Sequence, residues 1–348
     1  MVKSDTALSS APPKVVVLAL PETPLLSIAQ PMDVFGSAPT MWRNIFPDTT
    51  PRRFDVSLVS VDGRPVTTMC GLPVGVHAGI DEIERTDLVV VTAMVRGNET
   101  GQMLKSVVPW LRAQHERGSR IASLCTGAFV LAATGLLDGK NATTHWGAAR
   151  RFASTFPSVR LLPHRLIVDE APLYTSGGSL GSMDLCFYLV ETLLDRETAL
   201  NWSRVLVKDF RCASQSPFAV FAANRAHGDS DIIGIQDFLE EGYAEPLSIT
   251  DLARRAGMST RTFERRFKTA TGESPIAYLQ KLRIEAAKRM LEMKRDGVDQ
   301  ITIKVGYEDT ATFSKLFSRH VGIPPAAYRR KFTAPENGSL LDSTSPSW

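Results

Sequence analysis

Residues 247–291 read LSITDLARRAGMSTRTFERRFKTATGESPIAYLQKLRIEAAKRML, and residues 305–332 read VGYEDTATFSKLFSRHVGIPPAAYRRKF. The two segments share two phenylalanines, a glycine, a proline and a tyrosine at one fixed offset. The repeated residues are Phe263, Phe267, Gly272, Pro275 and Tyr278 in the first segment, and Phe313, Phe317, Gly322, Pro325 and Tyr328 in the second. Five matches at one offset are hard to obtain by chance, so the sequence predicts two copies of one structural unit.

Each copy begins with a short amphipathic helix that ends at a glycine, Gly257 or Gly306, where the chain can take a left-handed turn. In the helix that follows, the two phenylalanines are four residues apart and face the core, which leaves small, polar and basic side chains outside. Such a pair of helices is a helix-turn-helix, whose second helix can enter the major groove of DNA. A long helix over 276–294 is predicted to join the copies. An all-α bundle that binds a protein is the alternative, but a repeat of this shape and charge has few other uses.

The charge is distributed unevenly along the chain. The net charge is +3, but residues Asp251 to Phe332 carry 18 Lys and Arg against 9 Asp and Glu, while the remainder carries 22 against 28. A basic block attached to a mildly acidic one is typical of a nucleic-acid-binding domain joined to a non-binding domain. Chance asymmetry of a solvated surface is the alternative.

These two segments resemble the AraC/XylS-type DNA-binding domain. The resemblance implies a transcription regulator, more often an activator, that binds operator or promoter DNA and has RNA polymerase as a partner. It implies that base-facing side chains lie on two recognition helices: Thr260, Arg261, Glu264 and Arg265 on the first, and Thr310, Ala311 and Lys315 on the second. Ala311 can offer only an apolar contact, so the second helix is expected to read DNA less than the first. On the joining helix, Lys281, Arg283 and Lys288 are expected to contact phosphates.

The N-terminal half alternates Val-rich apolar runs with helical stretches. The predicted strands are 14–20, 54–61, 87–94 and 119–125, and the predicted helices are 103–116, 126–134, 183–194 and 197–210. This alternation predicts an α/β domain with a parallel sheet and helices on both faces, of the flavodoxin-like kind. We expect this domain over 14–212, a linker over 213–230, and an all-α domain with two helix-turn-helix units over 231–333. The Ser/Pro/Thr-rich segments 1–13 and 334–348 are predicted to be disordered tails.

Residues 119–146, SRIASLCTGAFVLAATGLLDGKNATTHW, place a thiol at a sharp turn between a strand and a helix. The predicted strand runs into Cys125, and a helix opens at Thr126. A helix N-terminus binds anions and lowers a thiol pKa. His145 follows downstream and is a candidate to approach the thiol. The alternatives are a small packing residue at Cys125 and a structural histidine at 145.

This segment, with 25–37 (LLSIAQPMDVFGS) and 174–194 (YTSGGSLGSMDLCFYLVETLL), resembles the PfpI-type branch of the class I glutamine amidotransferase-like superfamily over about residues 14–195. The cysteine at the turn is the nucleophile of enzymes in that superfamily. Here Ser27 stands where those enzymes usually have a carboxylate, Gln30 replaces a common glycine, and Thr126 follows the cysteine in place of a histidine. A thiol without base or carboxylate is poorly activated. Asp33 or Glu22 would have to replace the missing acid, so no catalysis is predicted and Cys125 is a vestigial nucleophile position.

The prediction for this domain is therefore a sensor without enzymatic activity. A pocket at the carboxyl edge of the sheet is expected to bind a small nitrogenous metabolite, an amino acid or related amine with an anionic group. Its predicted lining residues are Ser27, Cys125, Thr126, His145, Gly177 and Gly178. Two alternatives stay open: a Cys-dependent amidase or hydratase-like enzyme fused to a DNA-binding domain, and a redox sensor that uses Cys125.

The remaining features predict a cytoplasmic protein that needs no membrane, metal or cofactor. The longest early apolar run is far shorter than the ~20 residues of a membrane span, and the polar N-terminus does not look like a signal peptide. Four scattered cysteines fit a reducing compartment, and Cys70, Cys186 and Cys212 are predicted to be packing residues. A homodimer through the N-terminal domain is expected by analogy with related domains.

Overall fold

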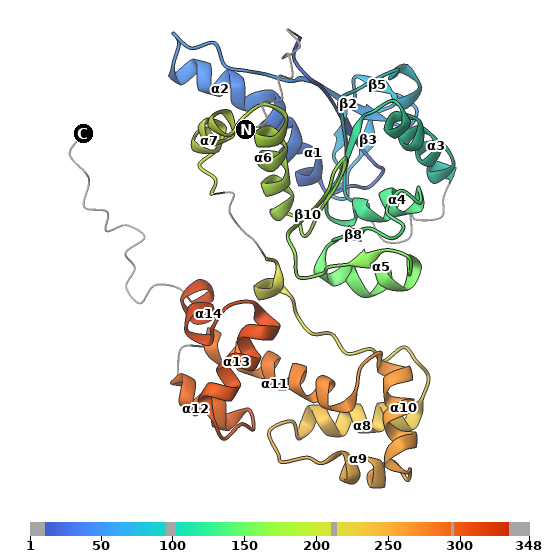
Figure 1. Ribbon diagram of the computed structural model, residues 1–348, viewed down its shortest axis with the longest axis vertical. Coiled ribbons are helices and arrows are strands. Elements are labelled where there is room, and N and C mark those ends of the chain that lie inside the picture. Colours follow the sequence, from blue (N-terminus) through green and yellow to red (C-terminus); the bar gives the residue numbers. More distant parts are fainter. Residues whose placement is uncertain (1–10, 95–101, 210–213, 294–295, 334–348) are drawn as a thin grey trace, which may run out of the picture. The chain divides into compact units, whose positions relative to one another are not determined.

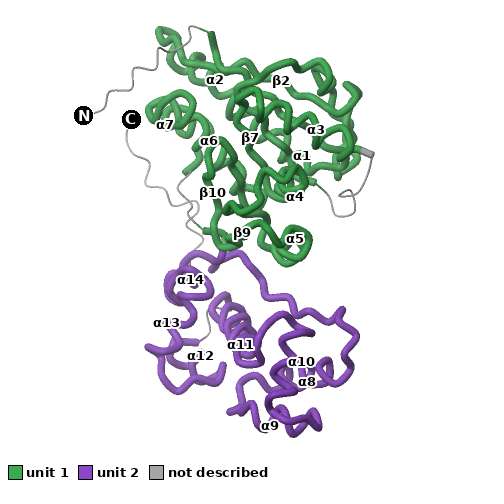
Figure 2. Tube along the Cα trace, turned by 45° about the vertical axis from the view of Figure 1, so that its right-hand side comes forward, with its two compact units in different colours: residues 1–215 green, residues 216–348 purple. Residues whose placement is uncertain are grey.

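The computed structural model describes residues 11–94, 102–209, 214–293 and 296–333 of the chain. The chain divides into two compact units, residues 1–215 (unit 1) and 216–348 (unit 2), which are coloured separately in Figure 2. Most of the two predicted tails, together with Cys212, lies outside the described residues. In the part of the chain that is described, no helix combines the length and apolarity needed to cross a membrane.

Unit 1 is built on a seven-stranded sheet with the strand order β10-β11-β7-β6-β1-β2-β5 (Figure 1). Neighbouring strands are parallel except for the antiparallel pair β10 and β11. The strands of this sheet are β1 (Lys14–Leu18), β2 (Asp55–Ser60), β5 (Ala78–Gly79), β6 (Leu88–Val91), β7 (Arg120–Ser123), β10 (Ile167–Glu170) and β11 (Leu173–Ser176). Two small sheets pair β3 (Val66–Thr67) with β4 (Pro73–Val74), and β8 (Asn141–Ala142) with β9 (Arg160–Leu161).

Helices cover both faces of the main sheet (Figure 1). On β1, Val15 and Val17 pack into one core and Val16 and Leu18 into the other, so the strand is apolar throughout. One layer holds α1 (Leu25–Met32), the π-helix η1 (Asp33–Ser37), α2 (Ala38–Ile45), α6 (Gly181–Leu193) and α7 (Arg196–Val205). The other holds α3 (Gln102–Glu116), α4 (Ala128–Ala133) and α5 (Ala149–Thr155). The predicted α/β architecture is confirmed. The helix predicted over 197–210 ends earlier, because Val207 has a left-handed backbone (φ 48°) that no α-helix continues.

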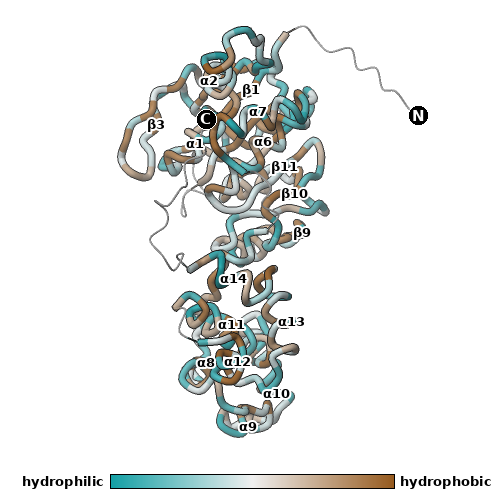
Figure 3. Tube along the Cα trace, turned by 90° about the vertical axis from the view of Figure 1, so that its left-hand side faces the viewer, coloured by the Kyte–Doolittle hydropathy of each residue, from teal (hydrophilic) through white to brown (hydrophobic). Residues whose placement is uncertain are grey.

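Unit 2 consists of short helices around two separate cores. Its helices are α8 (Ser230–Glu241), α9 (Ile249–Arg255), α10 (Thr260–Thr271), α11 (Pro275–Glu292), α12 (Val298–Lys304), α13 (Thr310–Val321) and α14 (Pro325–Phe332). The N-terminal part of α11 packs in the core around α9 and α10, and its C-terminal part packs in the core around α12 and α13. Hydrophobic and hydrophilic residues alternate along these helices, as amphipathic helices require (Figure 3). The predicted pair of helix-turn-helix units joined by a long helix is therefore present.

The repeated aromatic residues form the same cluster of rings in both copies. The rings of Phe263 and Phe267 lie 5.6 Å apart, and those of Phe267 and Tyr278 lie 5.4 Å apart. The corresponding centroid distances in the second copy are 5.7 and 5.6 Å. Gly272 and Gly322 end the two second helices with φ values of 85° and 83°. The repeat thus encodes the packing of each second helix and the place where it stops.

The predicted linker differs from the structure, because unit 2 begins at Ser216 and part of 213–230 is packed. Residues Ser216–Phe218 form the 3-10 helix η5. The Phe221 ring lies 5.2 Å from the Tyr278 ring, and the Asn224 side-chain amide donates to the Ala270 carbonyl at 2.8 Å. An extended segment held by single anchors has no helical or strand period, so the sequence pattern did not indicate this packing.

Candidate functional site

Cys125 lies at the turn between β7 and α4, as predicted. Its backbone has φ 55°, a left-handed value that is rare for a residue with a side chain. The 3-10 helix η3 (Cys125–Gly127) follows directly. A Cβ added to Gly127 would lie 2.5 Å from the Thr92 carbonyl oxygen, so only glycine lets this turn pack against the end of β6. Backbone strain held in place by close packing is frequent at functional sites.

The environment of the Cys125 thiol keeps it protonated at neutral pH. Burial raises the pKa of this thiol, while hydrogen bonds from Thr126 and from the backbone of Ser179 act in the opposite direction. The helix N-terminus was expected to lower the pKa. That expectation is wrong, because the desolvation of a thiolate here outweighs the nearby donors. A protonated thiol is a weak nucleophile and reacts slowly with oxidants.

The hydroxyl groups of Ser27 and Thr126 are both bound to the chain just beyond β6. Ser27 Oγ accepts a hydrogen bond from the Ala93 amide at 2.8 Å. Thr126 Oγ1 donates to the Met94 carbonyl at 2.6 Å and accepts from the Met94 amide at 3.0 Å. Since Ala93 and Met94 are neighbours, Ser27 and Thr126 lie at the same edge of the sheet.

His145 lies in a segment that contacts the turn but does not pair with the thiol. Thr144 Oγ1 donates to the Cys125 carbonyl at 3.0 Å. His145 Nδ1 accepts from the Gly147 amide at 3.0 Å, and burial lowers the pKa of the imidazole, so the ring is neutral at pH 7. A Cβ added to Gly178 would lie 2.9 Å from His145 Cδ2. Among the hydrogen bonds of the described residues, none joins this ring to the thiol.

The structure therefore brings the predicted pocket residues to one edge of the sheet. Ser27, Cys125 and Thr126 are linked there through β6 and the turn, and Ser176, just before Gly177, accepts a hydrogen bond from the Cys125 amide at 3.4 Å. Whether a small molecule binds among these residues stays a prediction. Asp33 and Glu22 are both exposed, so neither supplies the buried carboxylate that an active enzyme of this kind would need.

Sequence reasoning gave too little weight to Gln30 and missed Gln215. Gln30 is only 4% exposed, and neither atom of its amide has a hydrogen-bond partner among the described residues. Ser27 and Gln30 are three residues apart on α1 and share a helix face. The substitution of Gln30 for a common glycine was the available signal. Gln215 lies in the segment predicted as a linker, where no pattern marked it.

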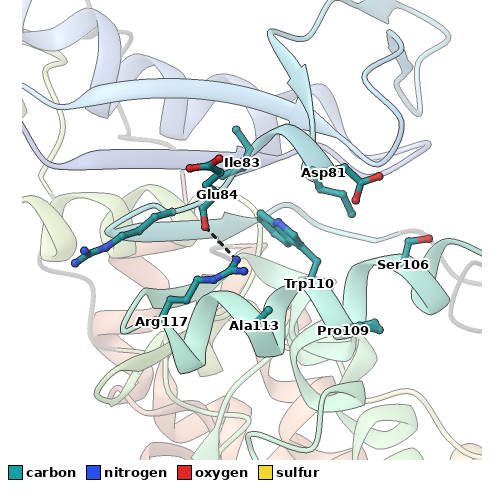
Figure 4. A pocket seen from close by; sticks show the side chains of 10 residues that line it. Asp81, Ile83, Glu84, Ser106, Pro109, Trp110, Ala113 and Arg117 are labelled. Carbon is teal, nitrogen blue, oxygen red and sulfur yellow. Dashed lines mark hydrogen bonds between the residues drawn. The ribbon is translucent and has the colours of Figure 1, made fainter.

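A separate groove of about 750 Å³ lies between the 3-10 helix η2 (Ile80–Glu82) and α3 (Figure 4). Arg117 crosses it and donates to the Glu84 carbonyl at 3.0 Å. The Trp110 indole nitrogen is buried there and has no partner in the described part of the chain. None of the predicted site residues lines this groove, so it is distinct from the edge that holds Cys125.

On unit 2, the first recognition helix α10 exposes the predicted base-facing residues Thr260, Arg261, Glu264 and Arg265. Ser259 caps this helix by accepting a hydrogen bond from the Thr262 amide at 3.3 Å. Within the described residues, no ion pair involves Arg261 or Arg265, so both guanidinium groups are available. Arg266 differs, because it pairs with Asp229 at 2.7 Å and with Asp231 at 3.0 Å.

The second recognition helix, α13, offers fewer polar side chains for contact with DNA than α10 does. Ala311 and Lys315 are exposed, as predicted. The Thr310 hydroxyl donates to Asp299 at 2.9 Å and is less available for DNA than expected. Asp309 caps the helix by accepting from the Thr312 amide at 2.7 Å, and hydrogen bonds from Thr312 lower the pKa of this carboxyl. Lys315 is therefore the one charged side chain among the three predicted on this helix.

The basic residues of α11 that were predicted to contact phosphate are bonded within the protein. Arg283 donates to the carbonyls of Tyr243 at 2.7 Å, Gly306 at 2.9 Å and Glu245 at 3.0 Å, so its guanidinium joins the segment between α8 and α9 to the end of α12. Lys288 is 4% exposed and pairs with Glu285 at 2.9 Å.

The third α11 residue in the prediction is also engaged, since Lys281 pairs with Glu273 at 2.5 Å. Arg289 is exposed on the same helix and is the better candidate for a phosphate contact. The charge count could not separate these residues, because it does not show which basic side chains are buried or already paired.

Comparison with known proteins matches both units. The model of the DJ-1/PfpI family matches residues 13–192, and a helix-turn-helix domain model matches residues 252–331. The chain is 28% identical to the HTH-type transcriptional regulator GbdR of Pseudomonas aeruginosa over 274 residues, 78% of this chain and 74% of that one. It is also 28% identical to the HTH-type transcriptional regulator GlxA of Rhizobium meliloti, over 64% of this chain and 68% of that one. An isonitrile hydratase of Pseudomonas putida is 28% identical over 52% of this chain and 72% of its own.

The environment of the cysteines predicts which thiol reacts first. Cys186 is buried, as predicted, but Cys70 is exposed, which corrects its assignment as a packing residue. A hydrogen bond with Thr68 lowers the pKa of the Cys70 thiol. At pH 7, iodoacetamide should therefore label Cys70 well before Cys125, and raising the pH should speed up labelling of Cys125. Peptide mapping by mass spectrometry measures both rates in one sample. Faster labelling of Cys125 than of Cys70 at pH 7 would contradict this account and favour a reactive sensor thiol.

Proposed function

Since the chain belongs to the DJ-1/PfpI family and carries a helix-turn-helix domain, we propose that it is a transcription regulator that binds operator or promoter DNA through unit 2. The observation that carries the proposal is the outer face of α10, where Arg261 and Arg265 are exposed and without an ion-pair partner in the described chain. The similarity to GbdR covers 78% of the chain, which is more than either unit alone contains, and supports the same assignment.

The geometry of α10 suits the reading of bases. Arg261 and Arg265 are four residues apart, so their side chains leave one helix face a single turn apart. Each guanidinium can donate two hydrogen bonds to the O6 and N7 atoms of a guanine, an arrangement that other bases do not match. On α13, Ala311 offers an apolar contact, for instance to a thymine methyl group, and Lys315 one charge. The first recognition helix is accordingly the main reader, and the second mainly positions the domain.

For unit 1, we propose binding of a small nitrogenous effector without catalysis. The Gln30 amide and the Ser123 hydroxyl, at the end of β7, are buried and have no partner among the described residues. Buried polar groups are normally satisfied, and a ligand or an ordered water would satisfy these two. The protonated Cys125 thiol and the absence of a carboxylate at position 27 argue against the hydratase activity of the Pseudomonas putida relative. The raised thiol pKa likewise disfavours a redox sensor.

We propose that effector binding changes DNA binding or contact with RNA polymerase, that the protein acts as an activator in the cytoplasm, and that it is a homodimer through unit 1. Two-fold pairing is the commonest arrangement among soluble oligomers. It also suits DNA sites with two half-sites.

The neighbours Arg265 and Arg266 provide a matched test of DNA reading. Arg265→Ala should weaken binding to a site selected from random DNA by about 1–3 kcal/mol at one base pair, with little effect on scrambled DNA. Arg266→Ala should lower the free energy of unfolding through loss of the pairs with Asp229 and Asp231, and leave the sequence preference unchanged. Fluorescence anisotropy with both DNAs, and urea denaturation of both variants, give these values. If Arg265→Ala weakens binding to both DNAs equally, α10 is not the main reader.

The effector site can be tested through Gln30. A ligand that binds only the folded state raises the melting temperature by mass action. We expect at least one compound among amino acids, betaines and polyamines to raise it for the natural chain but not for Gln30→Leu, which replaces the unpartnered amide by an apolar side chain. Equal shifts in both proteins would place the ligand elsewhere, with the groove beside Trp110 the next candidate.

A further inference from the structure

Gln215 is the last residue of unit 1, and its side chain is inserted into the edge that carries the predicted pocket. The residue is 3% exposed. Its Oε1 atom accepts hydrogen bonds from the amides of Trp146 at 3.2 Å and Gly178 at 3.1 Å. Trp146 and Gly178 are the direct neighbours of His145 and Gly177. A side chain of the protein itself therefore occupies part of the region where a small ligand was expected.

The nitrogen end of the same carboxamide is surrounded by carbonyl oxygens. Gln215 Nε2 donates to the carbonyls of Pro163 at 2.8 Å, Thr144 at 2.9 Å and Arg165 at 3.2 Å. Together with the two amides at Oε1, these groups satisfy the whole side chain. We call the five backbone groups, from Thr144, Trp146, Pro163, Arg165 and Gly178, the amide cradle.

A glycine makes room for this side chain. A Cβ at Gly177 would lie 2.7 Å from the Gln215 carboxamide carbon. Gly177 has no positive φ, so its backbone does not require glycine and the need is one of space. Gly177 and Gly178 were predicted to form part of a ligand pocket. In the structure, the space beside Gly177 holds the Gln215 side chain.

The donors and acceptors of the cradle select one kind of chemical group. Two N–H groups point at one atom, which must be an acceptor, and three carbonyls surround the other, which must be a donor. A carboxylate would place its second oxygen against three carbonyl oxygens, and a guanidinium would place N–H against N–H. Both arrangements leave buried polar groups unpaired, which is costly. A neutral carbamoyl group, an amino group on a carbonyl carbon as in a primary carboxamide or a ureido compound, meets all five.

Directly after Gln215, the chain contacts both helix-turn-helix copies of unit 2. The Phe218 ring lies 5.4 Å from Phe332 in the second copy, and the Phe221 ring lies 5.2 Å from Tyr278 in the first. Between them, the Ala219 carbonyl accepts a hydrogen bond from the buried Lys288. The segment 216–221 thus spans the two helix-turn-helix copies, and its first residue follows the one held by the cradle.

We propose that Gln215 is a releasable latch, and that an effector carrying a carbamoyl group binds the cradle in its place and frees the segment 216–221. This deepens the proposed function and rests on it for the link to DNA. A tethered side chain competes at an effective concentration on the order of millimolar, so a natural effector needs contacts beyond the amide. The ring of His145 lies against Gly178 and is placed to supply one. The Cys125 thiol has no part in the exchange.

Chemical rescue tests the cradle. Gln215→Ala removes the four atoms beyond Cβ, which correspond to acetamide, and keeps the backbone bond from the Gln215 amide to the His164 carbonyl. Acetamide should raise the melting temperature of this variant by about 2 °C or more and leave the natural chain unchanged. Acetate and acetamidinium, equal in size, should not. Equal effects of acetamide and acetate, or no effect on a folded variant, would overturn the proposal.

Hydrogen exchange tests the latch. The backbone amides of Ser216 and of residues 218–221 should exchange faster in full-length Gln215→Ala than in the natural chain, and acetamide should restore their protection. Gly177→Ala provides a second route if the first variant does not fold, because its Cβ expels the carboxamide. Gly36→Ala is the control, since its Cβ meets nothing within 4 Å. Unchanged protection of 216–221 in both release variants would refute the latch. None of these readouts involves DNA, so they stand apart from the test of Arg265.

Discussion

A cluster of three aromatic rings fixes the orientation of each recognition helix, and the DNA-binding face follows from it. Phe263 and Phe267 must face the core, where Tyr278 covers them. Residues two positions earlier lie about 200° around the helix, so Arg261 and Arg265 must face outward. The same geometry in the second copy makes Ala311 and Lys315 face outward. Core packing and base reading are thus two consequences of one constraint, and the copies differ only in what the outer positions carry.

Local patterns in the sequence predicted most of the architecture. The repeat of unit 2, the apolar strands of unit 1 and the turn at Cys125 all depend on residues close together in the chain, where periodicity and glycine placement are informative. The expected phosphate contacts of Arg283 and Lys288, by contrast, did not foresee the bonds that these side chains make within the protein. Their partners at Tyr243, Gly306 and Ala219 are distant in sequence, and a charge count does not show pairing.

The sequence predicted where the candidate site of unit 1 lies, but not the protonation of its thiol or the side chain that enters it. Ser27, Cys125 and Thr126 lie at one edge because parallel strands end there. The sequence predicted a lowered pKa for the Cys125 thiol, and this was wrong. Burial, a property of the whole fold, raises the pKa by more than the helix N-terminus lowers it. Gln215 could not be found at all, because a single side chain in an aperiodic stretch leaves no pattern. Its carboxamide nevertheless offers a physical connection between the edge that holds Cys125 and the segment that enters the DNA-binding unit.

We propose that both helix-turn-helix copies of unit 2 engage DNA on one face of the duplex. Hydroxyl-radical footprinting of the full-length protein on a site selected from random DNA tests it most directly. Recognition helices in successive major grooves protect two backbone patches about 10 base pairs apart on the same face. We expect two such patches, with the stronger sequence preference under the one that α10 contacts. A single protected patch, or protection that does not depend on sequence, would contradict it.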